Sequence, residues 1–185
     1  MRTLETPRLI LRPLLPEDEA FYSSLHGEAE VMRHIASPLT PDAAARAFRS
    51  ALQRNGASDD RDRCWGIVRR NGGDVIGVIG WHVQSAPGSL KTGNLGAILG
   101  RHAQGVGVSV EAGTALMRHA FTACRFEWLI TQHHAAHTHA ALMMAKLQFE
   151  RMPEASGTPC EVTWRMSVHR WSSLVGAWPV TDDDG

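Results

Sequence analysis

The segment at residues 96–112, GAILGRHAQGVGVSVEA, decides the fold. Its first part, up to Leu99, has the apolar character of a β-strand, and the pattern from about Ser109 onward is typical of a helix. The loop between them contains Gly105 and Gly107. Glycine adopts positive φ angles and lets the backbone approach a ligand closely. We therefore predict a strand, a glycine loop and a helix in direct succession.

The loop and the helix start favour the binding of an anion. The first N–H groups of a helix have no intrahelical partner, and the helix dipole places about half a positive charge there. A pyrophosphate is the natural ligand; the alternative is a glycine connection that only packs a helix on a sheet, and the spacing alone leaves both open. A Walker loop is excluded because no Gly-Lys-Ser/Thr follows. A Rossmann fingerprint fits poorly because the spacing after the strand differs.

Patterns on either side of this segment predict strands and helices in a mixed order. We expect a strand at residues 9–11, a helix at 19–33 that is bent or broken near Gly27, and a helix that begins at Thr40 and Pro41. The turn Asn71-Gly72-Gly73-Asp74 joins strands at 64–68 and 75–83. Strand 94–99, helix 109–124, strand 126–132, helix 136–147 and strand 162–168 complete the order. The fold class is α/β.

Length and composition indicate one globular domain. The chain has 185 residues, 43% of them hydrophobic and 21% charged, which excludes intrinsic disorder. We expect the domain at residues 1–175 and an acidic tail at 176–185. The formal net charge is zero, whereas nucleic-acid and membrane-surface proteins carry a basic excess. Neither a nucleic acid nor a membrane is therefore an expected partner.

The chain also lacks the marks of a membrane or secreted protein. No run of 18 apolar residues occurs, and Arg8 and Arg12 interrupt the apolar start, so we expect neither a transmembrane helix nor a signal peptide. Cys64, Cys124 and Cys160 are odd in number and widely spaced, which fits reduced thiols better than a disulfide framework. We predict a cytoplasmic protein.

Four segments resemble one family. The sequence QGVGV at 104–108, followed by Glu111 and Ala112, resembles the coenzyme A loop of the GNAT N-acetyltransferases, with the pattern Q/R-x-x-G-x-G/A. The opening LETPRLILRP at 4–13 is similar to that of the branch with ribosomal-protein N-terminal acetyltransferases. The segments LGAILG at 95–100 and KLQF at 146–149 resemble the central strand and the K-L-G-F end of a later helix. The resemblance covers about residues 1–170.

The resemblance implies a GNAT fold, with a mixed, mostly antiparallel central sheet flanked by helices and with splayed central strands. It also implies acetyl transfer from acetyl-CoA to a primary amine, either a protein N-terminus or a small amine. The amine attacks directly, so no covalent enzyme intermediate is expected. The oligomeric state stays open, a homodimer included.

The resemblance further assigns a cofactor-binding side of the site. Loop N–H groups would hold the pyrophosphate, the strand would pair with the pantetheine arm, and the N–H of Leu99 would polarise the thioester carbonyl. His137 stands where relatives have an Asn that helps to hold the coenzyme A arm. The other expected cofactor-binding residues are Ile98, Leu99, Gln104, Gly105, Val106, Gly107, Val108 and Ser109. For Glu111, the helix dipole predicts a structural role.

The side of the site that would carry out catalysis departs from the family pattern. The N-x-x-S segment is His137-Thr138-His139-Ala140, so Ala140 replaces the Ser. Gln148 replaces the Gly of K-L-G-F, and Asn94 replaces an acidic residue at the start of the central strand. The only tyrosine, Tyr22, lies far upstream. These departures motivate an alternative, a coenzyme A-binding module with little or no transferase activity.

Histidines are the remaining candidates for catalysis. Ten are present, and His133, His134, His137 and His139 cluster. We select His137 and His82 as candidate catalytic residues because an imidazole titrates near neutral pH; the alternatives are solvated loop side chains for the cluster and a satisfied, half-buried side chain for His82. The spacing of His133 and His137 would suit zinc, but no Cys or carboxylate completes a ligand set nearby, so we predict no metal.

Overall fold

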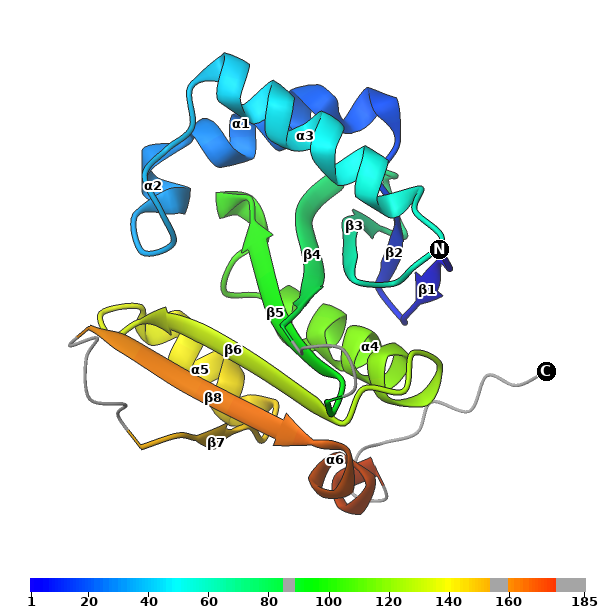
Figure 1. Ribbon diagram of the computed structural model, residues 1–185. Coiled ribbons are helices and arrows are strands. Elements are labelled where there is room, and N and C mark those ends of the chain that lie inside the picture. Colours follow the sequence, from blue (N-terminus) through cyan, green and yellow to red (C-terminus); the bar gives the residue numbers. More distant parts are fainter. Residues whose placement is uncertain (85–88, 154–159, 176–185) are drawn as a thin grey trace.

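The computed structural model describes residues 1–84, 89–153 and 160–175, so the predicted tail at 176–185 lies outside the described residues. Within them, eight strands form one sheet in the order β1-β2-β3-β4-β5-β6-β8-β7 (Figure 1). Every neighbouring pair is antiparallel except β5 and β6, which run parallel. The predicted mixed, mostly antiparallel sheet is confirmed.

The elements follow the predicted order, with four additions. The first half contains β1 (Leu4–Glu5), β2 (Leu9–Pro13), η1 (Pro16–Asp18), α1 (Glu19–Gly27), α2 (Ala29–Met32), α3 (Pro41–Asn55), β3 (Asp62–Arg69), β4 (Val75–Val83) and β5 (Thr92–Leu99). The second half contains η2 (Arg101–Ala103), α4 (Val108–Thr122), β6 (Trp128–His134), α5 (Thr138–Lys146), β7 (Glu150–Arg151), β8 (Glu161–Ser167) and α6 (Val168–Val175). The predicted break near Gly27 is confirmed, because Glu28 is extended between α1 and α2. The elements β1, η2, β7 and α6 were not predicted.

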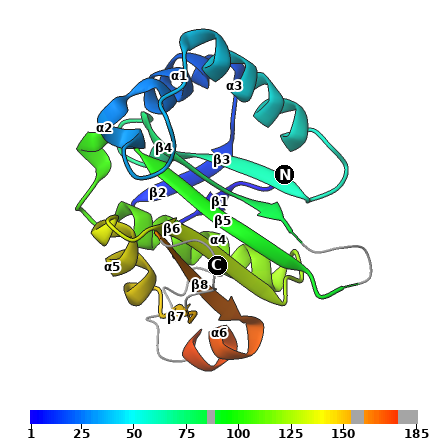
Figure 2. The ribbon, with the colours of Figure 1, turned by 60° about the vertical axis from the view of Figure 1, so that its left-hand side comes forward.

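Helices α1, α2 and α3 form a layer on one face of the sheet (Figure 2). Helix α3 begins as predicted, since the hydroxyl of Thr40 accepts a hydrogen bond from the N–H of Ala43 at 3.4 Å. Its apolar stripe buries Phe48 against Tyr22 of α1 and Val78 of β4. None of the described helices is long and apolar enough to cross a membrane.

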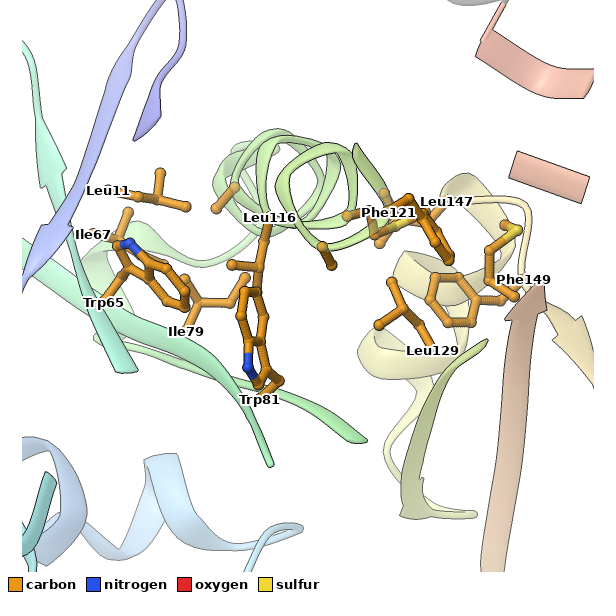
Figure 3. Packing of buried hydrophobic residues seen from close by; sticks show 14 of the residues in the cluster. Leu11, Trp65, Ile67, Ile79, Trp81, Leu116, Phe121, Leu129, Leu147 and Phe149 are labelled. Atoms are coloured by element: carbon orange, nitrogen blue, oxygen red, sulfur yellow. The ribbon is translucent and has the colours of Figure 1, made fainter. Parts of the chain in front are cut away.

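Helices α4 and α5 cover the opposite face. Helix α4 buries Leu116 among Trp65, Ile79 and Trp81 of the sheet, and Leu147 at the end of α5 belongs to the same core (Figure 3). These side chains are almost fully removed from water. Two separate apolar cores therefore hold helix layers on the two faces of one sheet.

The parallel strands β5 and β6 stay together only at their beginnings. Their pairing includes Thr92 with Trp128, Gly93 with Leu129, and Asn94 with Ile130. A Cβ atom at Gly93 would lie 2.7 Å from a ring carbon of Phe126, so only glycine allows this close approach. Beyond these pairs, β5 continues to Leu99 and β6 to His134 without a ladder between them. The predicted splay is confirmed, and we name this unpaired part of the sheet the β5–β6 gap.

The end of α5 explains the glycine that relatives carry in K-L-G-F. Gln148 occupies that position with φ 62°, a left-handed conformation that favours glycine. The N–H of Phe149 donates to the carbonyl of Met144, and the N–H of Gln148 donates to that of Ala145, both at 3.0 Å. These bonds close the helix and hold Gln148 in a conformation that is unfavourable for a side chain with a Cβ.

Replacing Gln148 by glycine is therefore expected to stabilise the protein. The change Gln148→Gly removes the left-handed penalty, and the free energy of unfolding should rise by about 1 kcal/mol, less the extra chain entropy of glycine in the unfolded state. Urea unfolding measures this difference. The control is Gln148→Ala, which also removes the amide side chain but keeps the penalty. Equal stability of the two variants would contradict the prediction.

Candidate functional site

The main chain of β5 presents a free edge along the β5–β6 gap. Two bonds to β4 fix the alternation: Gln84 N–H donates to the Thr92 carbonyl and Gly100 N–H donates to the Ile76 carbonyl, both at 2.9 Å. Even-numbered residues of β5 thus bond to β4, and the odd-numbered Ala97 and Leu99 direct their N–H groups into the gap. An extended ligand placed there would pair with β5 as an added strand.

The same register turns the main chain of Ile98 away from the gap and toward β4. Ile98 pairs with Val78, so its main-chain groups belong to the β4–β5 ladder. Its side chain packs against the apolar core beneath α1 and α3. Ile98 and Leu99 were the expected cofactor-binding residues of this strand. The register confirms that the main chain of Leu99 faces the gap. The other residue whose main chain faces the gap is Ala97, not Ile98.

The glycine loop follows at the end of β5. Gly105 has φ 77° and Gly107 has φ 82°, and Gly107 is the N-cap of α4. A Cβ atom at Gly105 would meet nothing within 4 Å, so this backbone borders open space. The side chain of Gln104 turns back and donates to the Leu99 carbonyl at 3.0 Å. The loop therefore brings its own N–H groups and the first N–H groups of α4, at Val108 and Ser109, to the edge of the gap.

A clamp from the start of the chain holds this loop. Glu111 accepts hydrogen bonds from the hydroxyl of Thr6 at 2.7 Å and from Nε of Arg8 at 2.6 Å. A second nitrogen of the Arg8 guanidinium donates to the carbonyl of Val106 at 3.1 Å. Burial opposes ionisation of Glu111, but the bonds from Thr6 and Arg8 outweigh it and hold the pKa of this carboxyl below its ordinary value. Glu111 does have a structural role, and it acts by joining residues 6–8 to the loop.

His82 lies away from the loop. It pairs with Asn94, five residues before Leu99 along β5, which is about 17 Å at the rise of an antiparallel strand. Its side chain is 63% exposed and bonds through Nδ1 to Asp62. The expectation of a half-buried side chain is wrong, although the ring does have a partner. The structure does not bring His82 to the Leu99 end of the gap.

Histidines from three elements meet beside the far end of β6. His34, in the turn after α2, stacks on His137, the N-cap of α5, with ring centroids 5.3 Å apart. His34 also stacks on His134 at 6.2 Å, and His133 stands edge-on to His137 at 6.2 Å. Sequence analysis identified the histidines of β6 and α5. It missed His34, because no local pattern relates residue 34 to residue 137.

Hydrogen bonds fix the orientation and the tautomer of the His133 ring. Trp164 donates its indole N–H to Nε2 of His133 at 2.9 Å, so the ring proton lies on Nδ1, which bonds to the carbonyl of His134 at 2.9 Å. Both ring nitrogens of His133 are thereby used. In the part of the chain that the structure describes, no three His, Cys, Asp or Glu side chains are grouped so that they could hold a metal ion.

Tyr22 is remote from this site. It lies on α1 in the core beneath α1 and α3, where it stacks on His26 with centroids 4.0 Å apart. Burial raises the pKa of Tyr22 to about 12. This phenol therefore has neither the place nor the acidity to protonate a leaving group at the gap.

Comparison with known proteins identifies the family. A family model described as an acetyltransferase (GNAT) domain matches residues 8–150. The chain belongs to the GNAT acetyltransferase family. No curated protein sequence matches this GNAT chain.

Solved GNAT structures share its fold. The Bacillus anthracis GNAT acetyltransferase is 16% identical and covers 91% of this chain and 99% of its own, with a TM-score of 0.76. The acetyltransferase of Agrobacterium tumefaciens is 23% identical and covers 90% and 94%, with a TM-score of 0.75. RimL, a ribosomal L7/L12 alpha-N-protein acetyltransferase in complex with coenzyme A, is 13% identical and covers 91% and 99%, with a TM-score of 0.76. The GNAT family transfers acetyl groups from acetyl-CoA, and this chain is such an acetyltransferase domain.

The conformation of Gly105 allows a test of the phosphate loop. Gly105→Ala places a methyl group where a pyrophosphate would approach the backbone, and acetyl-CoA affinity should fall at least tenfold. Titration calorimetry measures the affinity. The matched control is Gly73→Ala, since Gly73 also has positive φ and an open Cβ position but lies in the β3–β4 turn. If both variants bound acetyl-CoA like the parent protein, the loop would not be the phosphate site.

The contacts of Glu111 allow a test of whether the clamp shapes the loop. Glu111→Gln removes a negative charge beside the expected phosphates, which by charge alone would strengthen acetyl-CoA binding. It also weakens the bonds that position the loop, so we expect acetyl-CoA affinity to fall severalfold. Calorimetry on Glu111→Gln measures whether the affinity rises or falls. The control is Glu19→Gln, a partly exposed glutamate of α1. Tighter binding by Glu111→Gln would show that the clamp does not shape the loop.

Proposed function

We propose that the protein is an N-acetyltransferase that moves the acetyl group of acetyl-CoA to a primary amine. The observation that carries the proposal is the β5–β6 gap, where the unpaired N–H groups of Ala97 and Leu99 lead directly to the glycine loop and the start of α4. A linear ligand with a pyrophosphate at one end matches this succession of a strand edge and an anion site.

Each part of the chain has a proposed task. When bound, acetyl-CoA supplies a thioester whose acetyl group is ready for transfer. Residues 104–109 bind the phosphates, and the main chain of Ala97 and Leu99 aligns the arm. The N–H of Leu99 stabilises the oxyanion that develops on the carbonyl. The amine attacks this carbonyl directly, so the chain needs no nucleophile of its own.

His137 is proposed to border the coenzyme A arm. It is half-buried beside the end of β6, and burial followed by the nearby His34, His133, His139 and Arg33 lowers its pKa. The ring is therefore neutral at pH 7 and can accept a proton or a hydrogen bond there. A role in the reaction is not proposed for His82, because of its distance from Leu99.

The acceptor is proposed to be a protein N-terminus or a small amine. The opening at 4–13, which resembles that of ribosomal-protein N-terminal acetyltransferases, supports the first. Thr6 and Arg8 of this opening form the clamp on the glycine loop. The clamp would serve cofactor binding whatever the acceptor is. The proposal therefore keeps both acceptor classes, a protein N-terminus and a small amine. Cys64, Cys124 and Cys160 are all free, which supports the cytoplasmic location proposed from the sequence.

A second candidate function is a coenzyme A-binding module without transfer activity. Three observations favour it: Ala140 stands where relatives have a Ser on α5, Asn94 pairs with His82 within the β4–β5 ladder, and Tyr22 is buried in another layer. Such a module would keep the loop and the strand edge but would have no group that moves protons.

Turnover on a defined amine panel separates the two functions. The panel contains peptides with each of the twenty residues at a free N-terminus, together with spermidine and free amino acids. We expect acetyl-CoA-dependent release of free thiol, with formation of an N-acetylated product that mass spectrometry identifies. N-terminally blocked peptides are the control. Tight binding of acetyl-CoA without product on any amine would favour the binding module.

A further inference from the structure

Two imidazoles from opposite layers of the protein meet at the β5–β6 gap. His34 belongs to the layer of α1, α2 and α3, and His137 caps α5, which packs with α4 on the other face. Their rings stack at 5.3 Å with an interplanar angle of 29°. The ribbon shows β5 and β6 separating between the two layers (Figure 1). A fully paired sheet would keep the layers apart, so this separation lets the two rings meet.

The turn that carries His34 is anchored. Met32, two residues before it, is buried, and its carbonyl accepts the N–H groups of Ile35 at 2.8 Å and Ala36 at 3.1 Å. At the start of α2, Glu28 faces Arg101 of η2 at 3.8 Å. The element that carries His34 is thus held next to the segment that leads into the cofactor loop.

The rings of His34 and His137 differ from those of the other buried or half-buried histidines. His26, His119 and His133 each use a ring nitrogen in a hydrogen bond. His34 and His137 are also half-buried, yet within residues 1–84, 89–153 and 160–175 their ring nitrogens form no hydrogen bond. Neither residue is among those with buried, unpartnered side-chain nitrogens, so these ring nitrogens reach the solvent, where an acceptor amine can approach them.

The surroundings of His137 keep its ring unprotonated. The groups that face the two rings are His133 and His134 from β6, His139 from α5 and Arg33 from the end of α2. All are bases, and a cation close to others of the same sign is disfavoured. The lowered pKa of His137 agrees with this geometry. An imidazole that is neutral at pH 7 has a lone pair available for a proton.

We propose that His34 is the general base for the acceptor amine, with His137 as the stacked partner that positions it. This inference rests on the proposed N-acetyltransferase function. The ammonium form of the substrate gives one proton to a ring nitrogen of His34. The amine lone pair then forms the C–N bond to the acetyl carbonyl carbon, the C–S bond breaks, and the second amine proton passes to the thiolate. His34 returns its proton to water.

Variants of His34 test the proposal. His34→Gln keeps a polar side chain of similar size but cannot act as the base, so kcat/KM at pH 7 should fall about 100-fold or more. Acetyl-CoA affinity should not change, because cofactor binding uses the loop and the strand edge. The rising limb of the pH profile of kcat/KM, which reports the essential base, should be lost. In His34→Ala, added imidazole should restore part of the activity.

The exposed His169 of α6 provides the matched control, and His169→Gln should behave like the parent protein in every assay. Melting temperatures establish that each variant is folded, and a variant that does not fold is replaced by His34→Asn. If the parent protein is active and the kcat/KM of His34→Gln stays within twofold of the parent value from pH 6 to 9, the role of His34 is overturned. The proposed acetyltransferase function would be unaffected by that result. A parent protein that binds acetyl-CoA but acetylates no amine would overturn the proposed function itself, and the role of His34 with it.

Discussion

The separation of β5 from β6 is the constraint on which the rest of the structure depends. Two parallel strands that stayed paired would close the sheet, satisfy every main-chain group and keep the helix layers apart. Gly93 allows the strands to meet closely at one end, and the two apolar cores hold their other ends at a distance. Main-chain N–H groups inside a protein need hydrogen-bond partners. In the β5–β6 gap, the expected partner is a bound substrate.

A chain with no net charge can still bind a highly charged cofactor. The positive potential at the loop comes from main-chain N–H groups and from the dipole of α4, not from an excess of Lys and Arg. The charged side chains nearby have a different task, since Arg8 and Glu111 neutralise each other while they fix the loop. The histidines are likewise gathered in one place, at the far end of β6, where we propose that the substrate amine loses its proton.

Local signals predicted most of the fold and part of the candidate site. Thr40 and Pro41 mark the start of α3, the Asn-Gly-Gly turn marks the β3–β4 hairpin, and the glycine loop marks α4. These features depend on neighbours in sequence. His34 could not be predicted, because its partner lies 103 positions away and only the separated strands bring them together. The last helix, α6, and the short strands β1 and β7 likewise depend on tertiary packing rather than on a local pattern.

The clamp between the chain start and the cofactor loop also has a consequence for folding. Thr6 and Glu111 are separated by 105 positions, so their contact closes a very long loop and forms late in a folding reaction governed by contact order. A nascent chain would complete α4 before the loop is locked against residues 6–8. The loop that is proposed to bind coenzyme A would then reach its final geometry only in the complete fold.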